Sequence, residues 1–167
     1  MHRVRPQVAS KMEWENLKQT VYRRDGALRD IYVRDASRAD WAAWIALVNR
    51  DYPVRWVVEA YNEQAPADAI DADFIARWWD DGDRTSASAT VLLAHIHVKC
   101  YFFGESELEN DICPTEIQCL ADHERLMQYL VAVSMALGKE VIMTEETTDA
   151  PQVFVRVNGR NIHYDKL

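Results

Sequence analysis

Two histidines separated by a single residue form the sharpest pattern for metal chemistry in this chain. His95 and His97 fall in a segment that alternates between polar and apolar residues, so both imidazoles are expected on one face of a strand. Imidazoles placed in this way can share a metal ion, but a complete site needs further ligands. The residue four positions beyond His97 is Tyr101 rather than an acid. We therefore interpret the pair as a polar strand face, predict no cofactor, and keep both histidines as candidate metal ligands.

Nucleophilic and acid–base catalysis have less support. Cys113 lies in the most acidic part of the chain, where negative charge raises a thiol pKa and disfavours the thiolate. Glu145 and Glu146 are adjacent carboxylates, and without an apolar pocket both are expected to stay ionised. The sequence contains no G-x-S-x-G, Walker A or G-x-G-x-x-G pattern. We predict no catalytic residues and a protein that is not an enzyme.

The most informative feature is an uneven distribution of charge. Residues 104–150 contain eleven acidic and two basic residues, a net charge of −9, whereas residues 1–34 have a net charge of +4. The whole chain has a net charge of −8. Such a field repels nucleic acid and attracts basic proteins. We therefore expect a basic protein partner, no nucleic acid and no membrane.

Aromatic side chains near the acidic segment are candidates to anchor that partner. The adjacent Trp78 and Trp79 cannot both face the core from one helix, so one ring is expected at the rim of a binding surface. Carboxylates pair with Lys and Arg, and a desolvated aromatic ring supplies binding energy. The predicted partner-binding residues are Glu105, Glu107, Glu109, Asp111, Glu116, Glu145, Glu146, Asp149, Trp79 and Tyr101.

The elements that must position these residues indicate an α+β fold. Asp-Gly at residues 25–26 and Asn-Gly at residues 158–159 each separate two β-rich runs, which predicts a hairpin at both ends of the chain. Ser37 followed by Asp40 predicts the start of a helix that buries two tryptophans. The expected fold is a single domain with a twisted, mainly antiparallel sheet and about three packed helices.

The remaining segments have simpler patterns. Residues 88–103 read as one long strand with a bulge or bend, and residues 104–111 as an acidic loop. Asp122 is the expected N-cap of a helix that ends before Gly138, because leucines and a valine recur at spacings of three and four. Residues 1–12 are expected to be a flexible basic arm, and residues 13–167 the α+β domain.

Length and composition add the expected location. A chain of 167 residues fits one domain. No apolar run approaches the ~18 residues of a membrane span, and the N-terminus lacks the apolar core of a signal peptide. The three cysteines form no C-x-x-C pair, as in reduced cytosolic proteins. We expect a cytoplasmic protein, and the oligomeric state stays open.

Two segments suggest a class of proteins. The runs Tyr22–Val33 and Leu137–Glu146, together with small size, acidity and many tryptophans, resemble the immunity proteins of bacterial toxin–immunity systems, including contact-dependent growth inhibition. The resemblance implies a protein that neutralises a cognate toxin, often a basic nuclease, by docking acidic side chains into or beside its active site. The alternatives are a small-molecule- or metal-binding α+β domain using His95 and His97, and a structural module with a solvated acidic segment.

Overall fold

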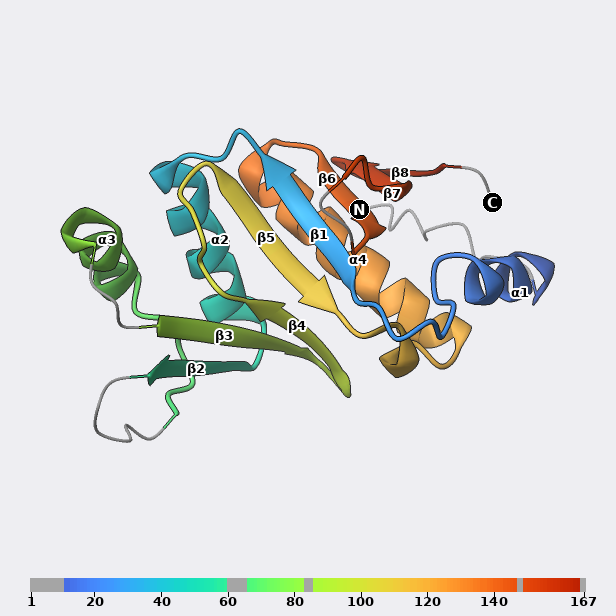
Figure 1. The fold of residues 1–167 in the computed structure, drawn as a ribbon, viewed down its shortest axis with the longest axis horizontal. Helices are drawn as coiled ribbons and strands as arrows, with labels where there is room; N and C mark the ends of the chain where they lie inside the picture. The colour runs from blue at the N-terminus through green and yellow to red at the C-terminus, as the bar shows by residue number, and fades with distance from the viewer. Residues whose placement is uncertain (1–10, 60–65, 83–85, 147–148, 166–167) are drawn as a thin grey trace, which may run out of the picture.

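The computed structural model describes residues 11–59, 66–82, 86–146 and 149–165. One antiparallel sheet of eight strands runs through the molecule in the order β2-β3-β4-β5-β1-β6-β7-β8 (Figure 1). The strands are β1 (Arg29–Arg34), β2 (Val54–Glu59), β3 (Ser86–Leu93), β4 (Ile96–Cys100), β5 (Glu107–Ile112), β6 (Val141–Glu145), β7 (Val153–Asn158) and β8 (Asn161–Tyr164). The helices are α1 (Lys11–Gln19), α2 (Arg38–Asp51), α3 (Ala72–Asp81) and α4 (Leu120–Leu137), with a 3-10 turn at Pro114–Glu116. The fold is α+β, as the sequence predicts.

Helices α2 and α4 cover one face of this sheet, with α3 beside α2 at one end and α1 at the other end (Figure 1). The core lies between the sheet and these helices, and every strand except β8 contributes buried apolar side chains to it. None of the described helices lies over the opposite face (Figure 1). That open face carries mainly polar residues of β1, β4 and β5, whereas β6 and β7 place the apolar Ile142 and Phe154 there.

The helix starting after Ser37 forms as predicted. The Ser37 hydroxyl accepts from the Asp40 backbone amide while the Asp40 carboxylate accepts from the Ser37 amide, a complete capping box. Trp41 and Trp44 are buried, and the helix ends before Pro53, which has no amide hydrogen. The Trp44 indole N–H donates to the Tyr129 hydroxyl of α4 at 3.0 Å, which joins the two covering helices.

The N-terminal hairpin prediction is wrong. Residues 11–19 form α1, and β1 pairs with β5 and β6 instead of with a preceding strand. Gly26 does turn the chain, with φ +84°. The turn is closed by the side chain of Arg29 rather than by a strand ladder, as described below. The C-terminal hairpin is confirmed, with Asn158 paired to Asn161.

Four other predictions differ from the structure. Residues 86–100 form the hairpin of β3 and β4, because Ala94 takes φ +58° and turns the chain where a bend was expected. The predicted acidic loop contains β5, which lies in the middle of the sheet. Helix α4 begins at Leu120, after Cys119, one turn earlier than the Asp122 cap. Of the predicted N-terminal arm, residues 1–10 lie outside the described residues, and residues 11–12 belong to α1.

No helix among the described residues combines the length and the apolar character that crossing a membrane requires.

Candidate functional site

Strand β5 places three predicted carboxylates on the open face of the sheet. Its burial alternates residue by residue, with Leu108, Asn110 and Ile112 buried toward the helices. The Tyr129 hydroxyl of α4 donates to the Asn110 side chain, which fixes this orientation. The remaining positions point the other way, because successive strand side chains alternate faces. These positions are Glu107, Glu109 and Asp111.

Strand β1 adds a carboxylate, Asp30, that lies outside the acidic segment of the sequence. Asp30 is only 8 % exposed and is the register partner of Asp111. The Tyr32 hydroxyl donates to the Asp30 carboxylate at 3.1 Å and lies 3.4 Å from Glu109. Glu146, just after β6, is close enough to raise the pKa of both aspartates. We call these five side chains the acidic face: Asp30, Glu107, Glu109, Asp111 and Glu146.

Burial and mutual repulsion shift the protonation of this group. Burial, followed by repulsion from Asp30 and Glu146, raises the pKa of Asp111 to about 6 even though the Lys99 ammonium acts in the opposite direction. The pKa values of Asp30 and Glu109 are also raised, in each case mainly by burial. Within the described part of the chain, no carboxylate of the acidic face has a salt bridge within 4 Å. The face therefore concentrates five carboxylates without a salt bridge, and the Lys99 ammonium and the Arg29 guanidinium only partly offset their effect on one another.

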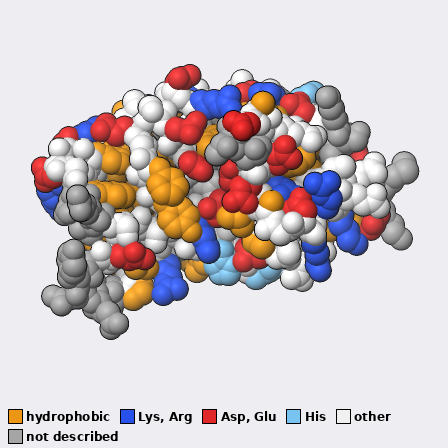
Figure 2. Space-filling model, viewed as in Figure 1, with side chains coloured by type: hydrophobic (Ala, Val, Ile, Leu, Met, Phe, Trp, Pro, Cys, Tyr) orange, Lys and Arg blue, Asp and Glu red, His pale blue; other side chains and the backbone are white. Residues whose placement is uncertain are grey.

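An exposed aromatic pair lies beside β5 where β4 ends. Phe102 is buried and adopts φ +57°, an uncommon conformation for a residue with a side chain. The flanking Tyr101 and Phe103 remain exposed, at 38 % and 75 %, and their rings stack with centroids 5.4 Å apart. In Figure 2 a hydrophobic patch borders the cluster of acidic side chains at the centre of the open face. Tyr101 was predicted as a partner-binding residue, whereas Phe103 was not.

Other predicted carboxylates are engaged in the protein's own structure. Glu105 forms a bidentate ion pair with Arg38, with contacts of 2.6 and 2.9 Å, and Asp80 completes the cluster. The Arg38 guanidinium also lies 5.9 Å above the Trp79 ring. Trp79 is half-buried and its indole N–H donates to the Phe102 carbonyl oxygen. Glu105 and Trp79 thus hold α2, α3 and the segment after β4 together.

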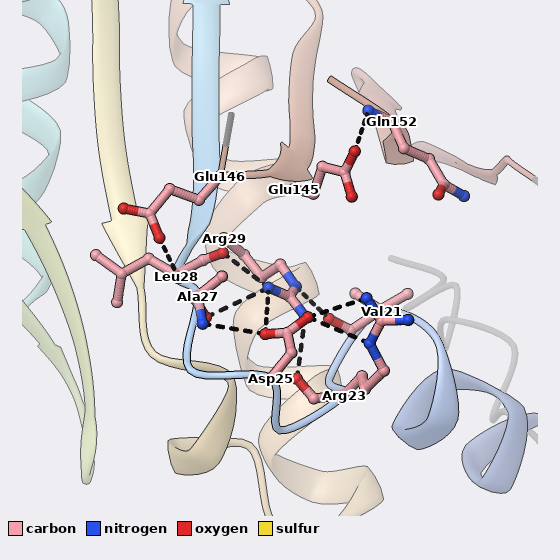
Figure 3. A network of polar contacts seen from close by, with 9 residues as sticks. All are labelled: Val21, Arg23, Asp25, Ala27, Leu28, Arg29, Glu145, Glu146 and Gln152. Carbon is pink, nitrogen blue, oxygen red and sulfur yellow. Dashed lines mark hydrogen bonds and ion pairs between the residues drawn. The ribbon is translucent and has the colours of Figure 1, made fainter. Parts of the chain in front are cut away.

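Glu145 and Glu146 have local backbone partners (Figure 3). Glu145 accepts from the Gln152 amide and Glu146 accepts from the Leu28 amide at 2.7 Å. Next to them, the fully buried Arg29 guanidinium donates to carbonyl oxygens of the turn before β1 and pairs with Asp25 at 3.1 Å (Figure 3). Glu146 keeps an exposed side chain on the acidic face, whereas Glu145 secures the connection between β6 and β7.

The two candidate metal-binding histidines are also engaged. The Glu116 carboxylate accepts a hydrogen bond from the His97 backbone amide at 2.8 Å, and its other oxygen lies 2.7 Å from His97 Nδ1. His95 Nε2 lies 2.9 Å from the Glu116 carbonyl oxygen and 3.2 Å from the Asp122 carboxylate. These contacts tie β4 to the start of α4. Among the described residues, no group of three or more His, Cys, Asp or Glu side chains is placed to hold a metal ion.

Two surface hollows lie away from these histidines. One, of about 410 Å³, borders the acidic face; the other, of about 620 Å³, lies over β7 and β8. The first is lined by Tyr32, Arg34, Asp35, Lys139, Glu140, Ile142 and Arg156, so charges of both signs surround it. The last predicted acid, Asp149, is exposed in the segment after β6. The hollow over β7 and β8 is lined by Gln152, Val153, Arg156, His163, Tyr164 and Asp165.

The acidic face is thus built from residues that are distant in sequence. Asp30 was missed because only the pairing of β1 with β5 brings it beside Asp111. Its position in the alternation Asp30, Tyr32, Arg34 was a readable indication that it faces away from the core. No family model, curated protein or solved structure matches this chain significantly. The geometry described above is therefore the basis for assigning a function.

Proposed function

We propose that this protein is a stoichiometric inhibitor that binds a basic protein through its acidic face. The observation that carries the proposal is the group of five carboxylates without salt bridges among the described residues, on a sheet face that no described helix covers (Figure 1). Like charges placed side by side cost stability. A cationic surface docked there relieves that repulsion and accelerates encounter.

The negative charge of this surface limits the class of partner that it can bind. Nucleic acid is repelled by a protein of net charge −8 with a concentrated acidic face. A second copy of the same face is repelled for the same reason. The resemblance to immunity proteins adds the expectation of a cognate toxin, of the nuclease type, in the bacterial cytoplasm. A nuclease cleft is basic because it binds phosphates, and carboxylates docked there occupy the place of those phosphates.

The test compares protein capture by the unmodified chain and by a variant of the acidic face. The variant combines Glu107→Gln, Glu109→Gln and Asp111→Asn, which removes charge at nearly constant volume. We expect the unmodified chain to retain a basic protein from lysate of the source cell at low salt. We also expect it to abolish that protein's activity, measured as nucleic-acid cleavage, at a one-to-one ratio.

A control variant makes the same change in net charge elsewhere. It combines Glu15→Gln, Asp68→Asn and Asp81→Asn, three exposed carboxylates outside the acidic face. The control variant should capture and inhibit like the unmodified chain, and the acidic-face variant should do neither. Equal capture by both variants, or a captured protein whose activity is unaffected, overturns the proposal.

A further inference from the structure

Tyr101 and Phe103 expose an unusual amount of aromatic surface. Phe103 is 75 % exposed, and its ring is nearly parallel to that of Tyr101, with an interplanar angle of 20°. The buried Phe102 between them anchors the segment in the core by contacts with Trp41, Trp44 and Trp56. The exposed pair is therefore held on a fixed base, as interface aromatic anchors are.

Carboxylates of the acidic face lie next to this pair. Lys99 of β4 is the register partner of Asp111 of β5. Tyr101 follows β4 directly, two residues after Lys99, and Glu109 lies two residues before Asp111 on β5, so the direction of the antiparallel pair carries Tyr101 toward Glu109. Both carboxylates are close enough to Cys100 to raise its pKa, after burial as the main cause. The aromatic rings and two carboxylates thus form one corner of the open face.

The molecule already uses the same combination of groups once. Arg38 lies 5.9 Å above the ring of Trp79 and pairs with the carboxylates of Glu105 and Asp80. A planar guanidinium can stack on an aromatic face and pair with carboxylates at once, which an ammonium does less well. At the corner formed by Tyr101, Phe103 and the β5 carboxylates, none of the described arginines fills the corresponding place.

We propose that the Tyr101–Phe103 pair and two carboxylates of β5 receive one arginine side chain of the protein partner. Those carboxylates are Glu109 and Asp111. This inference rests on the proposed function, because it names the group by which the basic partner is recognised. Lys99 borders the same site and makes no ion pair within 4 Å among the described residues. An arginine of the partner therefore competes with Lys99 for Asp111, which is the register partner of Lys99.

Short peptides test the site without the natural partner. The probes are acetyl-Gly-Arg-Gly-amide, the same peptide with lysine, and the same peptide with citrulline, a neutral analogue of arginine. Each is titrated into the isotope-labelled full chain at low salt, and backbone amide shifts are followed by NMR. We expect the arginine peptide to produce saturable shifts at residues 101–103 and 109–111. Binding of the lysine peptide should be about two- to fivefold weaker, the size of an exposed cation–π contact, and citrulline should give no shifts.

Two variants separate the roles of the rings and the charges. Tyr101→Leu with Phe103→Leu should abolish the preference for arginine over lysine, while Tyr101→Phe should keep it. Glu109→Gln with Asp111→Asn should abolish binding of both cationic peptides. The spectrum of each variant checks its fold.

Equal binding of the arginine and lysine peptides overturns the arginine site, as does a preference that survives the double leucine variant. Shifts spread evenly over all exposed acids also overturn it. Any of these results leaves the proposed inhibitor function to be decided by the capture experiment, in which the acidic-face and control variants are compared. Conversely, loss of the difference between those two variants removes the inhibitor function even where the arginine peptide binds.

Discussion

Asp30 of β1 and Asp111 of β5 stand directly opposite each other in the sheet, and both carboxyls have raised pKa values. Opposed like charges weaken a strand pair. Here the pair is retained at the centre of an eight-stranded sheet. Perturbed carboxyls gathered in this way are characteristic of functional surfaces.

Replacing Asp111 should stabilise the protein at neutral pH. The folded state holds the Asp111 pKa at about 6, against 3.8 ordinarily, so it binds more protons than the unfolded chain between these pH values. The free energy of unfolding therefore falls as pH rises from about 4 to about 6. Asp111→Asn should be more stable than the unmodified chain by about 1–2 kcal/mol at pH 7.5, after allowance for solvent screening. The difference should nearly vanish at pH 4 in urea unfolding, and the exposed Asp68→Asn control should show no such trend.

Titration of His123 should lower the free energy of unfolding as pH falls, which is opposite to the effect of Asp111. His123 lies between the hydroxyls of Tyr22 and Tyr164, at 2.7 and 2.8 Å, and burial lowers its pKa to about 4. The folded state therefore binds fewer protons than the unfolded chain between pH 4 and 6.5, and stability is lost as pH falls through that range. His123→Gln should flatten this acid limb. The measurement is best made with Asp111→Asn also present, so that the opposing titration is absent.

The hydrogen bonds between His123 and the two tyrosines should also contribute to stability at neutral pH. Tyr22→Phe removes one hydroxyl and leaves His123 Nδ1 buried without its partner. We expect a loss of about 1–2 kcal/mol in the free energy of unfolding. Tryptophan fluorescence during urea unfolding measures this loss directly. A loss below a few tenths of a kcal/mol would show that another group satisfies the imidazole.

Arg29 should be among the least replaceable residues in the chain. Its side chain is 1 % exposed and donates to backbone carbonyl oxygens that include those of Val21 and Arg23 (Figure 3). Arg29→Met has a similar length but removes every hydrogen bond of the guanidinium, which leaves the Val21 carbonyl oxygen without the donor described here and takes one of its partners from the Asp25 carboxylate. We expect a loss of about 3–5 kcal/mol or failure to fold. An exposed Arg24→Met control should change stability by less than about 0.5 kcal/mol.

The rate of association with a basic partner should depend on the salt concentration and on which carboxylate is replaced. Glu109→Gln with Asp111→Asn should slow association at low salt about three- to tenfold, and the difference should shrink at 0.5 M salt because of screening. Glu105→Gln should have a smaller effect, because Arg38 already compensates that carboxylate. Stopped-flow measurement with the captured partner gives these rates. Equal slowing by both variants would show that net charge alone, without the acidic face, governs encounter.

Local sequence patterns predicted the elements whose stabilising contacts are close in the chain. The capping box of Ser37 and Asp40 and the hairpin at Gly159 involve residues only a few positions apart. The first Asp-Gly also turns the chain, but no local pattern indicated that the Arg29 side chain would replace a strand partner. The type of an element could therefore be predicted where its stabilising contacts join residues close in the sequence. It could not be predicted where a distant or buried polar side chain determines the local structure.

The acidic segment shows why only part of the site was predictable. Glu107, Glu109 and Asp111 were selected by charge, and their charge also led to their interpretation as a loop. The buried Leu108 and Ile112 between and beside them carry the alternation of a strand. The place of Asp30 in the acidic face could not be predicted, because its neighbour Asp111 is 81 positions away. Strand pairing over that distance leaves no local pattern in the sequence. Exposure of Phe103 likewise depends on where β4 leaves the sheet.

The position of β1 between β5 and β6 has a consequence for biosynthesis. Both flanking strands lie far toward the C-terminal side of the sequence, so β1 leaves the ribosome long before either partner exists. Loop closure over such distances is entropically slow, and a central strand that waits unpaired is prone to aggregate. We expect refolding in milliseconds to seconds rather than microseconds. We also expect nascent chains that stop before β5 to need chaperone protection.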